Sequence, residues 1–94
     1  MLHCCICKVA CGSHHTLALD TNGCVYAWGC NEHGELGLGD LKNRNEPTLI
    51  SFFKKQTIVD IAAGDGFSVC VDQLGRVYCF GWNEMVSLSR GYNE

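Results

Sequence analysis

The sequence has few charged residues, a single proline and no long apolar segment. Only 18% of its 94 residues are charged, and seven basic residues are scattered among ten acidic ones, for a formal net charge of −3. Proteins that bind nucleic acid or anionic membranes usually carry a basic patch, so neither partner is expected. No run approaches the roughly 18 apolar residues of a membrane span, and the start of the chain lacks the basic residues and length of a secretory signal. These absences predict a cytoplasmic or nuclear protein.

The apolar content, by contrast, is high. Hydrophobic residues make up 47% of the chain, which indicates a packed chain rather than a disordered one. The length allows at most one small domain with a modest core and leaves no room for a separate catalytic module. We therefore expect no enzymatic activity and no cofactor.

Eight cysteines are present, which is many for this length. Without a secretory signal, free thiols are favoured over a disulfide framework. Cys11, Cys70 and Cys79 stand where another part of the chain has alanine, in the alignment described next. This exchange predicts that they are small buried residues.

The chain contains an internal repeat with a period of 52 residues. Residues 6–32 align without a gap to residues 58–84 and share ten identities, among them the Val-Tyr pairs that begin at Val25 and Val77. A fixed period of this size is typical of repeat architectures.

Each copy predicts three β-strands in series. Apolar, β-branched runs end at Gly12 and Gly64, and each is followed by a second run and then by the Val-Tyr run. The second and third runs are joined by Asp-x-x-Gly, in which aspartate can cap a turn and glycine can adopt a positive φ. Both faces of the third strand carry apolar or small residues, so a sheet covered on both sides is expected.

The run from Pro47 to Phe53 predicts an edge strand, because proline is tolerated at the start of such a strand. We assign this strand to the second copy, which makes that copy a complete four-stranded sheet and leaves the first with three strands. Repeated four-stranded sheets indicate a β-propeller. The predicted fold is all-β, with one complete and one partial blade and four antiparallel strands per full blade. The predicted parts are an N-terminal extension (1–5), a partial blade (6–31), an inter-blade linker (32–46), a complete blade (47–83) and a divergent C-terminal tail (84–94).

The order and spacing of these motifs resemble the repeat of the regulator of chromosome condensation family, over about residues 6–83. The resemblance rests on the stretch from Gly12 to Leu19, the turn at Asp20, the Val-Tyr-Ala-Trp-Gly strand and the glycine-rich stretch Gly34–Asp40. The positions taken as structural positions of the repeat are Gly12, His15, Gly23, Trp28, Gly29, Gly37, Gly39, Pro47, Gly64, Gly75 and Gly81.

A complete member of this family is expected to form a seven-bladed propeller. The resemblance also implies roles in guanine-nucleotide exchange on the small GTPase Ran, in chromatin binding, and in protein binding beside kinase or ubiquitin-ligase domains. This chain departs from the pattern: it has two repeats, Phe67 stands where the first copy has His15, and the motif fails after Glu84. We therefore interpret it as a fragment of a longer repeat protein, whose exposed ends would contact the missing blades of that protein or self-associate.

Three alternative sites remain. Cys4, Cys7, Cys11 and His14 have a spacing that would suit zinc, although alternation along a strand disfavours four convergent ligands. Two further groups are assigned structural roles. The His14-His15 pair could carry protons but lacks an assignable nucleophile, and the tryptophan and tyrosine residues could stack bases but lack a basic groove.

The favoured function is a protein-binding scaffold that acts through blade-edge loops such as His33–Glu46. Its expected partner is a protein, with small GTPases and ubiquitin-pathway proteins as the implied classes. The alternatives are guanine-nucleotide exchange on a Ran-type GTPase by the full-length parent, and a small zinc-binding module.

Overall fold

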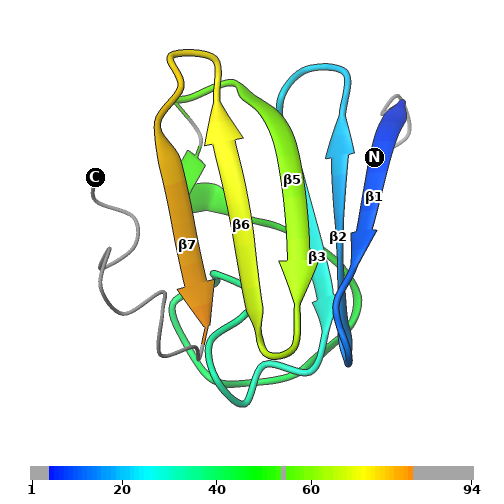
Figure 1. The fold of residues 1–94 in the computed structure, drawn as a ribbon. Coiled ribbons are helices and arrows are strands. Elements are labelled where there is room, and N and C mark those ends of the chain that lie inside the picture. Colours follow the sequence, from blue (N-terminus) through cyan, green and yellow to red (C-terminus); the bar gives the residue numbers. More distant parts are fainter. Residues whose placement is uncertain (1–4, 54, 82–94) are drawn as a thin grey trace.

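The computed structural model describes residues 5–53 and 55–81, which form two antiparallel sheets (Figure 1). The elements are β1 (Ile6–Cys11), β2 (His15–Asp20), β3 (Val25–Gly29), β4 (Arg44–Leu49), the 3₁₀ helix η1 (Ser51–Phe53), β5 (Ile58–Gly64), β6 (Phe67–Asp72) and β7 (Val77–Gly81). The first sheet has the order β1-β2-β3-β4, and the second has the order β5-β6-β7. The predicted all-β fold, with one four-stranded and one incomplete blade, is confirmed. None of the described residues belongs to a helix long and apolar enough to cross a membrane.

The prediction of the Pro47 strand is wrong in its start, its partner and its end. The strand, β4, begins at Arg44, inside the predicted linker 32–46. β4 pairs with β3, through Tyr26↔Leu49 and Ala27↔Thr48, so it completes the first blade and not the second. The Ile50 N–H extends this pairing by donating to the Val25 carbonyl at 2.9 Å, and the chain then turns through η1, so the strand does not continue to Phe53. Strand order along the chain was compatible with either sheet, because a strand can pair with the sheet before it as readily as with the sheet after it. The edge position of the strand, which tolerates Pro47, was predicted correctly.

The turns after β2 and β6 are built identically, which confirms the repeat in three dimensions. Asp20 Oδ1 accepts hydrogen bonds from the Asn22 and Cys24 N–H groups, both at 2.9 Å. Asp72 Oδ1 accepts from Leu74 at 3.0 Å and from Arg76 at 2.9 Å. The second carboxylate oxygen of each aspartate accepts a hydrogen bond from a tyrosine hydroxyl, at 3.2 Å from Tyr26 and 3.0 Å from Tyr78. The predicted aspartate caps are therefore present, and each also anchors the following strand.

The charge of Asp72 is maintained within this turn. Burial pushes its pKa upward, but hydrogen bonds from the backbone and side chain of Arg76, from Tyr78 and from Leu74 outweigh burial, and the pKa lies below its usual value. The carboxylate is therefore ionised when it caps the turn.

Glycine is required at two kinds of position in the repeat, because neighbouring atoms leave no room there for a Cβ. A Cβ on Gly12 would lie 2.3 Å from the Gly64 carbonyl oxygen and 2.3 Å from the His15 ring. Gly29 adopts a φ of +111°, and a Cβ there would lie 2.7 Å from the backbone of residues 14 and 15. Gly64 and Gly81 repeat the contacts made within a sheet, since a Cβ on Gly64 would lie 2.3 Å from the Phe67 ring and one on Gly81 2.8 Å from the Phe67 Cα, whereas Gly12 also makes room for the second sheet.

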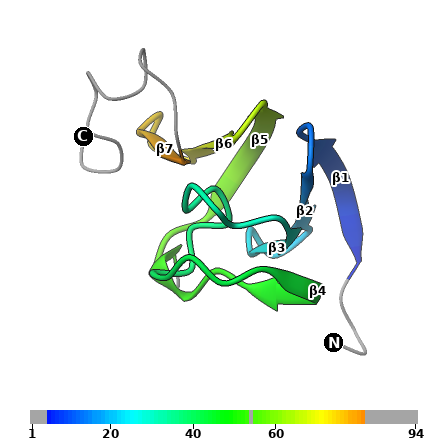
Figure 2. The same ribbon diagram turned by 90° about the horizontal axis from the view of Figure 1, so that it is seen from below.

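The core lies between the two sheets. Side chains of β2 and β3 in the first sheet face side chains of β5, β6 and β7 in the second, and the two sheets are in closest contact where β5 packs against β1 and β2. Toward β4 and β7 the sheets diverge, and Figure 2 shows the chain between β3 and β4 (teal) and the chain after β4 (green) running through this opening. The buried side chains that fill this wedge are Leu36, Ile50 and Phe53.

The cysteine predictions are confirmed only in part. The seven described cysteines are free thiols. Cys70 is buried in the core, and burial, with a smaller contribution from Cys79, raises the pKa of its thiol to about 12. Cys79 is half-buried, whereas Cys11 is exposed because it lies on the open face of edge strand β1, so its predicted burial is wrong.

Candidate functional site

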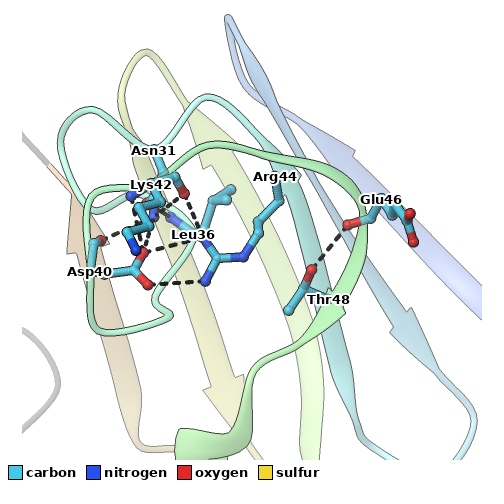
Figure 3. A network of polar contacts seen from close by, with 7 residues as sticks. All are labelled: Asn31, Leu36, Asp40, Lys42, Arg44, Glu46 and Thr48. Carbon is cyan, nitrogen blue, oxygen red and sulfur yellow. Dashed lines mark hydrogen bonds and ion pairs between the residues drawn. The ribbon is translucent and has the colours of Figure 1, made fainter.

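A long loop, residues 30–43, connects β3 to β4 and is hereafter called the connecting loop. Its organising residue is Asn31, which is fully buried. The Asn31 Nδ2 group donates to the Asp40 carbonyl at 3.0 Å, to Asp40 Oδ1 at 3.1 Å and to the Lys42 carbonyl at 3.0 Å. Its Oδ1 accepts from the Leu36 N–H at 3.0 Å (Figure 3). One side chain thus holds the two ends of the loop together.

An ion pair closes the same network on its outer side. Arg44 donates to both carboxylate oxygens of Asp40, at 3.2 and 3.0 Å, and to the Lys42 carbonyl at 2.6 Å. The hydrogen bond from Arg44 is the main reason that the pKa of Asp40 lies below its usual value. The two-point geometry fixes the orientation of the loop at the start of β4, as Figure 3 shows.

The glycine-rich part of the connecting loop lies against the second sheet. Gly37 has a φ of +69°, and a Cβ at this position would lie 2.6 Å from the Phe80 ring. The neighbouring Leu36 is buried in the core, so the loop is anchored by an apolar side chain as well as by hydrogen bonds. Gly37 therefore allows the backbone to pass directly over an aromatic ring.

An open concavity of about 660 Å³ lies beside this contact. Its lining comes from the connecting loop, η1 and β7, and most of its surface is apolar. The residues that line it are Gly34, Gly37, Leu38, Gly39, Asp40, Leu41, Ser51, Phe52 and Phe80. Leu41 and Phe52 are exposed at its rim, at 66% and 54%. A rigid rim with exposed apolar side chains can accept an apolar side chain from another molecule.

His15 occupies a different place, in the contact between the two sheets. Its Nε2 lies 2.8 Å from Ser68 Oγ, and the Ser68 hydroxyl donates to the Glu35 carbonyl at 2.6 Å. Because that hydroxyl hydrogen is used, Ser68 accepts from His15, so the ring carries its proton on Nε2. The chain of bonds joins the first sheet, the second sheet and the connecting loop.

The other ring nitrogen of His15 explains its protonation state. Nδ1 is buried and has no hydrogen-bond partner among the described residues. Protonation there would place an unpaired N–H and a charge in the core. Burial accordingly lowers the pKa of His15 below 6.5, although the nearby Glu35 and the backbone of Phe67 partly oppose this effect. His15 is therefore neutral near pH 7, and its hydrogen bond to Ser68 gives it a structural role in the contact between the sheets.

We expect stability to fall as the pH drops below about 6.5, because the unfolded chain then binds a proton at His15 that the folded chain does not. The sign follows from the lowered pKa of the folded chain. Above the pKa of the unfolded chain, His15 does not reduce the free energy of unfolding. Below it, the free energy of unfolding falls with pH until the pH reaches the pKa of the folded chain. The slope due to this residue is at most about 1.4 kcal/mol per pH unit. Urea unfolding at a series of pH values measures it.

His15→Phe is the matched control, since the second copy has Phe67 at the equivalent position. Ser68 keeps its bond to the Glu35 carbonyl in this variant. The difference between the pH profiles of the two proteins isolates His15, because every other titrating group is shared. Equal slopes below pH 6.5 would contradict the assignment.

The described members of the alternative zinc site, Cys7, Cys11 and His14, do not come together as a ligand group. Cys7 and Cys11 are exposed on β1, His14 is exposed in the turn after it, and Cys4 lies outside the described residues. Within residues 5–53 and 55–81, no three His, Cys, Asp or Glu side chains come together as metal ligands.

The sequence predicted a binding surface in the loop His33–Glu46, which stays a prediction, and it missed the residues that hold this loop in place. The roles of Asn31, of the Ser68 hydroxyl and of Phe52 were not predicted. One signal was available for Asn31, which is identical to Asn83 in the repeat alignment. Phe52 gave no signal, because its place beside the loop depends on where β4 pairs.

The remaining repeat positions serve the fold. Gly23 and Gly75 have positive φ values in the two matching turns, Gly39 has one in the connecting loop, and Trp28 is half-buried on the outer side of the first sheet.

Comparison with protein families gives two matches, both to models of the regulator of chromosome condensation (RCC1) repeat. One covers residues 22–71, and the other covers residues 6–35 and 58–85. The human RCC1 domain-containing protein 1 is 41% identical over 78 residues, which is 83% of this chain and 21% of that protein. The Ras guanine nucleotide exchange factor C of Dictyostelium discoideum is 39% identical over 80 residues, which is 85% of this chain and 6% of that protein.

Among solved structures, yeast RCC1 (Prp20) bound to Kap60 superimposes with a TM-score of 0.81 at 26% identity. The match covers 98% of this chain and 23% of that protein. The chain thus spans about a fifth of the first relative and of this structure, and much less of the exchange factor.

Proposed function

Because the chain belongs to the regulator of chromosome condensation repeat family, we propose that it acts as a protein-binding scaffold whose contact surface is the connecting loop and the concavity beside it. The observation that carries this proposal is a rigid loop with an open apolar hollow at its edge. Asn31 and the Asp40–Arg44 pair hold the backbone, while Leu41 and Phe52 stay exposed. Rigid presentation reduces the ordering cost of binding.

The likeness to yeast RCC1 (Prp20), which was solved bound to Kap60, supports a protein as the class of partner. The lining of the concavity favours a leucine or aromatic anchor from that partner, since apolar and aromatic anchors in pockets dominate such interfaces. We also propose that the chain is not an enzyme, since His15, one of the residues weighed for proton transfer, is committed to the contact between sheets.

Selection of a displayed random-peptide library on the folded chain tests the proposal. We expect enriched peptides with an apolar anchor, and Leu41→Asp to weaken their binding by about tenfold or more, a loss of roughly 1.4 kcal/mol. Leu74→Asp is the matched control, because Leu74 is 70% exposed in a turn outside the concavity. Calorimetry gives the affinities. Peptides that bind Leu41→Asp as tightly as the wild type would reject the concavity as the site.

Guanine-nucleotide exchange by a longer parent protein is the second candidate. The match to an exchange factor supports it, but the matched part is only 6% of that relative, which ties no activity to these residues. Release of a fluorescent nucleotide from a Ran-type GTPase separates the candidates. The scaffold proposal expects no acceleration by this chain, and acceleration would favour exchange.

A further inference from the structure

The outer face of each sheet carries residues that are equivalent, 52 positions apart, to residues in the interface between the two sheets. In the first sheet, Leu17, Leu19, Val25 and Ala27 point into the core. Their equivalents 52 residues later are Val69, Val71, Val77 and Cys79. These pair by register as Val69↔Cys79 and Val71↔Val77, on the side of the second sheet opposite Cys70 and Tyr78. We call this outer side of the second sheet the leading face.

The opposite outer side is related in the same way. Val9, Ala18, Tyr26 and Trp28 lie on the outer side of the first sheet, called here the trailing face. Their equivalents, Ile61, Cys70, Tyr78 and Phe80, form the core-facing side of the second sheet. The exposures show the relation: Val25 is 0% exposed and its equivalent Val77 is 46%, whereas Ile61 is 3% exposed and its equivalent Val9 is 54%.

From this relation we propose that the chain self-associates head to tail, with the leading face of one copy packed on the trailing face of the next. Each open face repeats one half of an interface that the molecule already makes with itself. Burial of matching apolar faces would drive the contact. A second copy is the occupant that the repeat specifies, because it presents both halves.

Polar contacts across the internal interface also transfer to the proposed one. Lys8 of β1 forms an ion pair with Asp60 of β5, and these two residues are themselves 52 positions apart. In a head-to-tail row, lysine and aspartate would therefore alternate, and Asp60 of one copy would approach Lys8 of the next. Like charges do not meet anywhere along this row.

A backbone hydrogen bond of the internal interface also has equivalent groups on the two outer faces. The Ile58 N–H donates to the Gly23 carbonyl across the interface at 3.0 Å, and Thr57 packs over Gly23. The equivalent groups are the Ile6 N–H and the Gly75 carbonyl. The space above Gly75 is open to 4 Å, so the start of β1 of another copy fits there.

Such an interface is heterologous, so association is not limited to a dimer. We therefore expect species larger than a dimer at high concentration.

The test uses Val9→Lys, which disables the trailing face, and Val77→Lys, which disables the leading face. Both residues are exposed in the single copy, so the variants should fold, as circular dichroism will check. Sedimentation analysis should show that the wild type assembles, while each variant alone remains at the mass of one copy. An equimolar mixture of the two variants should form a 1:1 heterodimer, because one intact face of each kind remains.

Leu74→Lys is the matched control and should assemble like the wild type, since Leu74 is exposed beside Gly75 and its equivalent Asn22 stays exposed beside the internal interface. A wild type that stays monomeric at high concentration would overturn the proposal. So would assembly that persists in both variants, or a mixture of folded variants that stays monomeric.

Discussion

Gly23→Ala lowers the free energy of unfolding by about 3 kcal/mol, whereas Gly75→Ala lowers it by only about 1 kcal/mol. The two glycines occupy matching turns and have nearly equal φ values of +86° and +85°. The new methyl group therefore meets the same backbone strain at both positions. It meets different neighbours: at Gly23 it lies 2.5 Å from Thr57 Cγ2 and 3.0 Å from Thr57 Cα, and at Gly75 it meets nothing within 4 Å.

The difference between the two variants isolates the contact between the sheets. Thr57 can rotate its methyl group away, but its Cα and the Ile58 backbone nitrogen, 3.1 Å from the new Cβ, cannot move without shifting β5. Urea unfolding of both variants in the Val9→Lys background provides the measurement without a contribution from self-association. Equal losses would mean that the turn after β2 does not pack on the second sheet.

The features predicted correctly from the sequence are those that depend on neighbouring residues. The Asp-x-x-Gly turns are local, and the 52-residue period marks both copies, so six of the strands and their hairpins follow directly. The pairing of β4 is not local. It depends on which of two free sheet edges the chain reaches after the connecting loop, and the composition of Pro47–Phe53 suits either edge.

Burial was predicted well where both copies share an environment and poorly where they do not. Cys70 lies inside the interface, but Cys11 lies on an edge strand at the end of the molecule, although its equivalent Ala63 packs against the core. The sequence predicted apolar cover on both faces of each sheet, whereas residues 5–53 and 55–81 cover only the face of each sheet that lies in the core. The two open faces carry apolar side chains that a single copy leaves exposed.

Replacing Asn31 with alanine should lower the free energy of unfolding by about as much as Gly23→Ala does. It should also disturb the connecting loop more than Gly23→Ala does. The change removes the acceptor of the buried Leu36 N–H and the donor to the carbonyls of Asp40 and Lys42. A buried N–H left without a partner costs about 1–3 kcal/mol, so the summed loss should be about 3 kcal/mol. Because Leu36 is fully buried, the loop should also release this side chain more often.

Hydrogen exchange at the Leu36 amide, followed by NMR, measures this release directly, because that amide hydrogen is bound by Asn31 Oδ1. Lys42→Ala is the matched control: it lies in the same loop and keeps the backbone carbonyl that Asn31 binds, so stability should stay within about 0.5 kcal/mol of the wild type. If exchange at Leu36 is unchanged in Asn31→Ala, the loop is held without Asn31 by the Leu36 side chain, the Asp40–Arg44 pair and the Ser68 hydrogen bond to Glu35. The binding surface would then depend on apolar anchoring, and Asn31→Ala should bind the selected peptides as tightly as the wild type does.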